Sequence, residues 1–221
     1  SFILDNTGPT VASIKTTIVQ GGVSYAKTQG NTFIVELRDD GVGISRGNVM
    51  LYVAGRSGTP DRCEGSYTCT WDSVDVSGSG TKVAEIRQDT TDILGNAVSA
   101  PLAINFIVDP DKPVVNKINI TGVGGAQATV PGFIKTGDSL LIIANVTDKN
   151  LENAYADLSK YITTASNVSA DGCLDVGGDE WLCVWETAHI NKSGPVEDYV
   201  RFTFTDIVGN ENKKHKEKLK V

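Results

Sequence analysis

Oxygen-bearing side chains gather in three short stretches from residue 109 onward, which read "DPDKP", "TDKN" and "TDIVGN". A calcium ion takes roughly six to eight hard oxygen ligands, and Asp and Asn side chains in loops supply them. Tight turns prefer the same residues, because these side chains hydrogen-bond to nearby backbone groups and tolerate positive φ. Both a calcium site and plain turn chemistry therefore stay open for the five candidate ligands, Asp109, Asp111, Asp148, Asp206 and Asn210.

The four cysteines form two pairs that are close in sequence, Cys63 with Cys69 and Cys173 with Cys183. A zinc site would need a C-x2-C spacing or nearby His ligands, and the sequence has only two histidines, which do not accompany both pairs. We expect a disulfide in each pair, with free thiols as the alternative. Each bond closes a short loop and is worth about 2 to 3 kcal/mol. Disulfides indicate an oxidising compartment, extracellular or periplasmic.

Four N-x-S/T sequons, all in the second half, are candidates for N-glycosylation. In the strands that we expect there, Asn119 and Asn145 have outward parity, whereas Asn167 and Asn191 fall in loops. The excess over chance is small, so glycosylation in the native host stays open. We expect no glycan in a bacterial expression product.

Other kinds of chemistry find little support. The chain has no G-x-S-x-G motif around a candidate nucleophile and no glycine-rich phosphate loop ahead of a helix. The net charge of −7 argues against a nucleic-acid surface. Apolar runs such as "SLLIIA" are far shorter than the ~20 residues of a membrane helix. We therefore expect no enzyme activity, no cofactor other than calcium, no nucleic-acid partner and no membrane contact by this segment.

The segments that contain these residues occur twice in the sequence. "FILDNTGPTV" at residues 2–11 returns as "FIVDPDKPVV" at 106–115, and "TDILGN" at 91–96 returns as "TDIVGN" at 205–210. Because the matches keep the same order, they indicate two homologous domains. The expected division is the end of a preceding repeat at 1–4, a first repeat at 5–108 and a second at 109–221. The segment is expected to come from a longer array of repeats.

Each repeat reads as a series of short strands. Apolar and polar residues alternate over short runs that Gly, Pro, Asn and Asp bound, and no window keeps a helical period. In the second repeat "SLLIIANVTD" directs Leu140, Ile142, Ala144 and Val146 inward. The first repeat follows the same pattern, although "VAEIRQDTT" places Gln88 where the second has Phe202. Six or seven such strands predict an all-β fold of two antiparallel β-sandwiches.

The order of a Pro-containing entry, "GDSLLIIANVTD", a Gly-rich hairpin and "YVRFTFTDIVGN" resembles the immunoglobulin-like or fibronectin-III-like repeats of bacterial and archaeal surface proteins, of the adhesin or surface-layer type. The resemblance covers nearly the whole chain but rests on short motifs. It implies two tandem immunoglobulin-like sandwiches in which T-D-x-x-G-N is the turn between the last two strands. One departure is that antibody domains join two facing strands by a disulfide, whereas these cysteines share one hairpin.

The resemblance also implies that the Asp-rich loops meet where the first strand enters, so that the five candidate ligands would surround one calcium ion at the junction between the repeats. The corresponding set in the first repeat has lost the upstream repeat that we expect before it, and is therefore expected to bind more weakly, if at all. That set is Asp5, Asp39, Asp40, Asp92 and Asn96.

The predicted function is a non-catalytic structural or adhesive segment of a larger extracellular or cell-surface protein. Its expected partners are adjacent repeats of the same chain and another surface protein or a glycan. The alternative is a carbohydrate-binding or accessory module of a secreted hydrolase. Tandem repetition favours the first prediction, because spacers gain length by repeating a unit.

Overall fold

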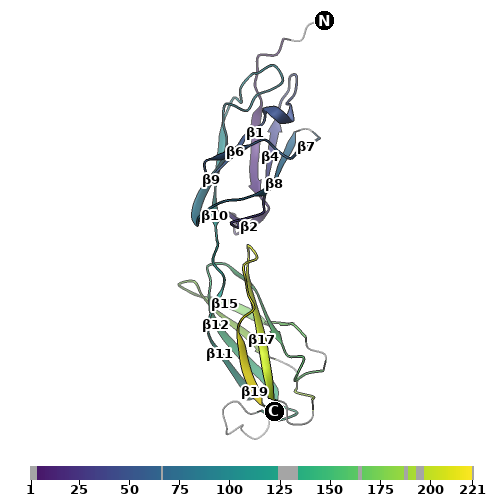
Figure 1. Cartoon of the computed structure of the whole chain (residues 1–221), viewed down its shortest axis with the longest axis vertical. Helices are drawn as coiled ribbons and strands as arrows, with labels where there is room; N and C mark the ends of the chain where they lie inside the picture. Colours follow the sequence, from purple (N-terminus) through teal and green to yellow (C-terminus); the bar gives the residue numbers. More distant parts are fainter. Residues whose placement is uncertain are drawn as a thin grey trace. The chain divides into compact units, whose positions relative to one another are not determined.

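The computed structural model describes residues 4–65, 67–123, 134–163, 166–186, 189–192 and 197–220 (Figure 1). Among these residues a single 3-10 turn, η1 (Arg46–Asn48), is the only helical element. No described helix is long and apolar enough to cross a membrane. The chain divides into two compact units, Ser1–Pro110 and Asp111–Val221. Of the predicted end of a preceding repeat, only Leu4 lies within the described residues, and it is almost fully exposed.

The first unit is a sandwich of two sheets. One sheet has the order β1-β4-β8-β7 and is antiparallel throughout. The other has the order β2-β3-β10-β9-β5-β6. In chain order the strands are β1 (Thr10–Thr16), β2 (Ile18–Gln20), β3 (Val23–Ala26), β4 (Asn31–Arg38), β5 (Leu51–Val53), β6 (Arg56–Gly58), β7 (Arg62–Glu64), β8 (Thr68–Val74), β9 (Gly80–Ile86) and β10 (Leu102–Val108).

The second unit repeats this plan. Its first sheet has the order β11-β12-β16-β15, and its second has the order β14-β13-β17-β18, with β19 also paired to β17. The strands are β11 (Val114–Val123), β12 (Ser139–Thr147), β13 (Leu151–Asp157), β14 (Val168–Ser169), β15 (Gly172–Gly177), β16 (Glu180–Glu186), β17 (Glu197–Asp206), β18 (Glu211–Asn212) and β19 (Lys216–Lys220).

Strand order identifies the fold. In each unit one sheet pairs its strands in the A-B-E-D order of an immunoglobulin-like domain, where A, B, E and D are β1, β4, β8 and β7 or β11, β12, β16 and β15. In the facing sheet strand C, which is β5 or β13, pairs with β9 or β17, as strands C and F do in that fold. The predicted fold class, all-β with two tandem immunoglobulin-like sandwiches, is confirmed. One pairing differs from the antiparallel expectation, because β3 lies parallel to β10. The chain leaves the first sheet after Thr16, and a tight turn at Gly21 and Gly22, both with positive φ, returns it along β10.

Each unit closes its own core. The alternation in β4 buries Phe33, Val35 and Leu37, and that in β12 buries Leu140, Ile142, Ala144 and Val146 as predicted. In the first core Phe33 meets Phe106 edge to face at 5.3 Å between ring centroids. In the second core Trp185 meets Phe202 in the same way at 5.8 Å. The two buried clusters have no residue in common.

The same hairpin is stapled in both units. Cys63 and Cys69 are directly opposed on β7 and β8 and form a disulfide, as do Cys173 and Cys183 on β15 and β16. Two residues after the second cysteine of each pair lies a buried Trp. Trp71 Nε1 donates to the Gly58 carbonyl at 2.9 Å, and Trp185 Nε1 donates to the Val168 carbonyl at 3.0 Å. Each Trp thereby links the stapled sheet to β6 or β14 in the facing sheet.

Candidate functional site

Three carboxylate groups lie together in the first unit, where Asp5, Asp39 and Asp92 each offer an oxygen within 4.8 Å of the others. We call them the carboxylate cluster. Asp5 precedes β1, Asp39 follows β4, and Asp92 lies in the loop between β9 and β10. In this fold the entry to the first strand and these two loops share one end of the sandwich, so the strand order gathers the three side chains. The spacing suits a cation that several oxygens coordinate together.

Asp92 is fully buried and organises the T-D-x-x-G-N turn. Its Oδ1 accepts a hydrogen bond from the backbone N–H of Asn96 at 2.8 Å, and its Oδ2 accepts one from Asn96 Nδ2 at 2.7 Å. Asn96 Nδ2 also donates to the backbone carbonyl of Asp5 at 3.2 Å. The turn chemistry that the sequence left open is therefore present, and it ties the loop to the segment that enters β1.

Asp5 is held in the ionised form by its neighbours. The backbone N–H of Val42 donates to Oδ2 at 2.8 Å, and Thr7 donates to Oδ1 through its backbone N–H and its hydroxyl. These hydrogen bonds, that of Val42 first, hold the pKa of Asp5 below its ordinary value. The cluster thus contains a stable negative charge.

One carboxylate oxygen of Asp39 accepts no hydrogen bond from the described residues. Its Oδ2 accepts from the backbone N–H of Gly43 at 2.6 Å. Its Oδ1 is buried and has no hydrogen-bond partner among the described residues. A buried carboxylate oxygen without a donor is costly, and two further carboxylates lie close to it. A bound cation would satisfy this oxygen and offset the repulsion within the cluster.

Not all of the five ligands predicted in the first repeat lie together in the structure. Asp5, Asp39 and Asp92 belong to the carboxylate cluster, and Asn96 supports it through hydrogen bonds. Asp40 is exposed and is not one of the three clustered carboxylates. The resemblance implies that all five residues belong to one group of loops, but it does not tell which carboxylates turn toward one another.

The five predicted ligands of the second set lie as follows. Asp109 follows β10 in the first unit and is buried, and its backbone N–H donates to the Ala26 carbonyl at 3.1 Å. The other four belong to the second unit: Asp111 is exposed, Asn210 is partly buried, and Asp148 and Asp206 are buried. Their joint assignment to calcium stays a prediction.

Within the second unit the turn around Asp206 copies that around Asp92. Asp206 Oδ1 accepts from the backbone N–H of Asn210 at 2.7 Å, and its Oδ2 accepts from Asn210 Nδ2 at 2.8 Å. Asp148 Oδ1 accepts from the backbone N–H of Asn150 at 2.9 Å. The repeated motif therefore builds the same local structure in both units.

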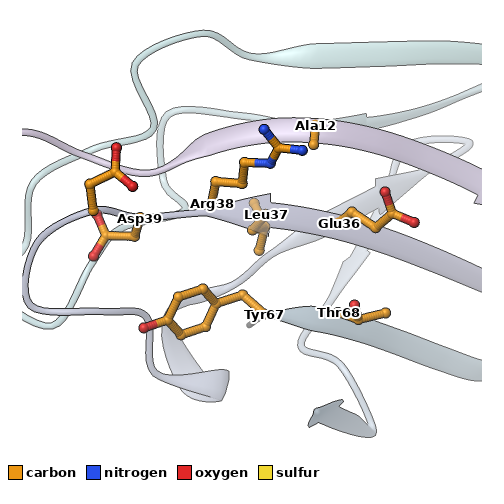
Figure 2. A pocket seen from close by; sticks show the side chains of 8 residues that line it. Ala12, Glu36, Leu37, Arg38, Asp39, Tyr67 and Thr68 are labelled. Atoms are coloured by element: carbon orange, nitrogen blue, oxygen red, sulfur yellow. The ribbon is translucent and has the colours of Figure 1, made fainter. Parts of the chain in front are cut away.

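A shallow hollow of about 380 Å³ adjoins Asp39. Figure 2 shows Asp39 and Tyr67 toward one end of it and Glu36 toward the other. The lining is mostly polar and includes Arg38, Asp40 and Thr68. Tyr67 is the single aromatic residue in this lining, whereas sugar-binding surfaces commonly present apolar aromatic faces.

The carbohydrate-binding alternative would need outward-facing aromatic residues, for which the second unit offers Tyr155 and Trp181. Trp181 packs against the second core, and its Nε1 donates to the Asp148 carbonyl at 2.6 Å. Tyr155 is partly buried on β13. Neither position forms part of an exposed aromatic row in the described residues.

The four sequons occupy the environments expected from the strand pattern. Asn119 is exposed on β11, and Asn145 is partly exposed on the outward side of β12. Asn167 is exposed beside β14 and has a φ of 54°. Asn191 is exposed in a loop, where its Oδ1 accepts from the backbone N–H and the hydroxyl of Thr163. Glycosylation at these positions stays a prediction.

No protein-family model matches the chain, and no curated protein sequence matches it significantly. Among solved structures, the fibronectin(III)-like modules of Clostridium thermocellum CbhA are 12% identical, with 94% of this chain and 92% of that chain covered and a TM-score of 0.38. Dimeric latent PorU from Porphyromonas gingivalis is 16% identical over 98% of this chain but 20% of its own, with a TM-score of 0.37. The Bacteroides ovatus protein SGBP-B, solved with a mixed-linkage heptasaccharide, is 10% identical over 97% and 48% of the two chains, with a TM-score of 0.27.

Proposed function

We propose that the chain is a non-catalytic structural segment of a larger secreted or cell-surface protein, in which the two immunoglobulin-like units act as spacer or interaction modules. The observation that supports this proposal is that the chain contains two copies of the same structural unit. Each copy has its own core, its own stapled hairpin and the same Asp–Asn turn. A spacer gains length by adding copies of one unit, and each unit here has its own buried core.

The disulfides support the extracellular part of the proposal. Both pairs of cysteines are bonded, and the described chain holds no free thiol. Disulfides persist in oxidising compartments and are rare in the cytosol. The partners that this location offers are neighbouring repeats, other surface proteins and glycans.

A glycan array separates the spacer proposal from its alternative. The whole chain, labelled and tested at several concentrations, is expected to show no saturable binding to any sugar. Specific binding that a Tyr67→Ala variant loses would place a carbohydrate site in the hollow beside Asp39 and favour the accessory-module function. An Asp175→Ala variant, changed at an exposed position on β15 of the second unit, is the control.

Calcium binding forms part of the same proposal. The buried, unpartnered Oδ1 of Asp39 supports a site at the carboxylate cluster, and the repeated motif supports a second one at Asp109, Asp111, Asp148, Asp206 and Asn210. Calcium at 100 times its Kd would stabilise the fold by about 2.7 kcal/mol through mass action. The melting temperature of the first unit is therefore expected to rise with calcium.

An Asp39→Asn variant tests the first of these sites. It is expected to melt at a higher temperature than the parent in EDTA, because one repelling charge is gone, and to lose the response to calcium. An Asp40→Asn variant changes the net charge equally outside the cluster and is expected to keep that response. If calcium raises the melting temperatures of the parent and of Asp39→Asn equally, the carboxylate cluster does not bind calcium.

A further inference from the structure

The outer surface of the sheet β11-β12-β16-β15 in the second unit carries a group of neighbouring aliphatic side chains. While the even-numbered residues of β12 face the core, Leu141 and Ile143 face outward. On this outer side Ile143 lies opposite Val184, and Leu182 lies opposite Leu174. Leu174 is 67% exposed, and the others are partly exposed. We call these five residues the aliphatic face: Leu141, Ile143, Leu174, Leu182 and Val184.

The fold does not require this composition, because the first unit builds the matching surface from polar residues. On the outer side of β1-β4-β8-β7, Lys15 pairs with Glu36 at 2.9 Å, and Arg62 pairs with Asp72. Ile34 is flanked there by Lys15 and Thr70. The aliphatic face is therefore a property of the second unit and not of the sandwich.

Two sequons border the aliphatic face. Asn119 on β11 is directly opposite Ile143, and Asn145 on β12 is directly opposite Leu182. Their sequon threonines, Thr121 and Thr147, lie on the same side of the sheet. The first repeat, whose matching surface is polar, contains no N-x-S/T sequon at all. The acceptor sites and the group of exposed aliphatic residues thus occur together in one unit, whereas the equivalent surface of the other has no sequon and presents Ile34 between polar neighbours.

The side chains leave the reactive nitrogens available. Asn145 Oδ1 accepts a hydrogen bond from Asn116 Nδ2 at 2.7 Å, and the same Nδ2 donates to Thr147 Oγ1 at 2.8 Å. This arrangement orients the amide of Asn145 by its oxygen, and its Nδ2 donates no hydrogen bond to a described residue. Asn119 is exposed beside a hollow of about 420 Å³, whose lining includes Ile120, Ile143 and Leu219. The hollow has room for the first sugar of a glycan.

We propose that Asn119 and Asn145 carry N-linked oligosaccharides that lie over the aliphatic face. In the attachment the amide Nδ2 bonds to C1 of a sugar donated by a lipid phosphate-linked oligosaccharide. The bond from C1 to the phosphate oxygen breaks, the phosphate leaves with the electron pair, and the amide nitrogen loses a proton. Sugars present C–H groups toward an apolar surface and hydroxyls toward water, so they can cover aliphatic side chains that would otherwise promote association. The inference rests on the proposed extracellular location.

Peptide mapping by mass spectrometry tests the attachment. The whole chain is secreted from a eukaryotic cell line that N-glycosylates, and occupancy is measured at each sequon. Most molecules are expected to carry glycans at both Asn119 and Asn145. Unmodified asparagine at these two positions would overturn the inference, whether or not Asn167 and Asn191 are occupied. That result would leave the spacer proposal intact, because the glycan array tests the latter independently on unglycosylated protein.

The covering role has its own test in the same cells. An Asn119→Gln/Asn145→Gln variant is expected to raise the fluorescence of a hydrophobic dye severalfold and to form oligomers in light scattering. The matched Asn167→Gln/Asn191→Gln variant is expected to behave like the parent. Adding Leu174→Ser and Leu182→Ser to the first variant should abolish the extra dye binding. Unchanged dye binding and mass in the first variant would show that the glycans do not cover the aliphatic face.

Discussion

Asn96 and Asn210 show how one side chain can determine a turn. Each donates its backbone N–H and its Nδ2 to the two oxygens of a buried Asp four residues earlier. A buried carboxylate needs such donors, because an unmet acceptor in the interior is costly. The T-D-x-x-G-N motif is therefore a structural unit, whatever ion the neighbouring carboxylates bind.

Replacing Asn96 tests the value of this turn. An Asn96→Ala variant removes the amide that donates to Asp92 Oδ2 and to the Asp5 carbonyl. We expect a loss of about 1 to 3 kcal/mol in the free energy of unfolding of the first unit, because a buried carboxylate oxygen loses its donor. Urea denaturation measures the loss. An Asp40→Ala variant, at an exposed position, is the control and should change stability little.

The hydrogen bonds to Asp5 predict a pH dependence. The folded-state pKa of this carboxyl lies below its unfolded value, so its contribution to stability is present above the unfolded pKa and is lost as the pH falls through the folded one. The melting temperature of an Asp5→Asn variant should therefore fall less on acidification below about pH 4 than that of the parent. Parallel melting curves for both proteins down to pH 2.5 would contradict this prediction.

One buried tyrosine, Tyr161, joins three segments of the second unit through its hydroxyl group. The hydroxyl of Tyr161 donates to the Asp198 carbonyl at 2.5 Å, and it also lies 3.0 Å from the Leu219 carbonyl. It thereby ties the loop after β13 to β17 and β19. Burial raises the pKa of Tyr161 to about 12. Since the raised pKa belongs to the folded state, the stability that it contributes is present below the unfolded pKa and is lost as the pH rises toward 12.

A Tyr161→Phe variant should lose about 0.5 to 1.5 kcal/mol of the second unit's stability at neutral pH, because the ring still fills the core while the hydroxyl bonds are gone. Between neutral and alkaline pH, the unfolding free energy of the variant should also fall less than that of the parent. Chemical denaturation at pH 7 and at pH 11 provides both comparisons. An unchanged unfolding free energy at pH 7 would contradict the proposed tie.

The disulfides act on elements at the edge of a sheet. They close loops whose ends are 6 and 10 residues apart, and they join residues that are already cross-strand neighbours. A Cys173→Ala/Cys183→Ala variant should lose about 2 to 3 kcal/mol, as the chain-entropy account predicts for short loops, and should keep its sandwich. Denaturation with unchanged far-UV circular dichroism checks both parts. Loss of the native spectrum would show that the staple is essential to the fold.

Strand β9 shows the limit of reading a repeat by alignment. Gln88 occupies the place of Phe202, and β9 ends before it, at Ile86. The buried Thr90 then stands where the second repeat has Phe204, and its Oγ1 accepts from the backbone N–H of Met50 at 3.0 Å. A side-chain hydrogen bond replaces apolar packing at this point of the first core.

At the scale of the whole molecule, separate cores predict separate folding. The clusters around Phe33 and Trp185 have no residue in common, so each unit should hold the stability that its own buried surface provides. We expect residues 1–110 and 111–221, produced apart, to unfold cooperatively at the denaturant midpoints that they show in the whole chain. A unit that fails to fold alone would contradict the spacer proposal, which assumes that each unit is self-contained.

The sequence by itself determined the repeat, the all-β class, the inward residues such as Leu140 and Ile142, and the pairing of the cysteines, because each of these is recorded in local spacing. Only the tertiary structure decided which carboxylates meet and which side chains share a surface. Asp5, Asp39 and Asp92 come from three distant segments, and Asn145 meets Leu182 only through the register of β12 against β16. Alternation along one strand states which way a residue faces, but its neighbours across the sheet depend on how distant strands pair.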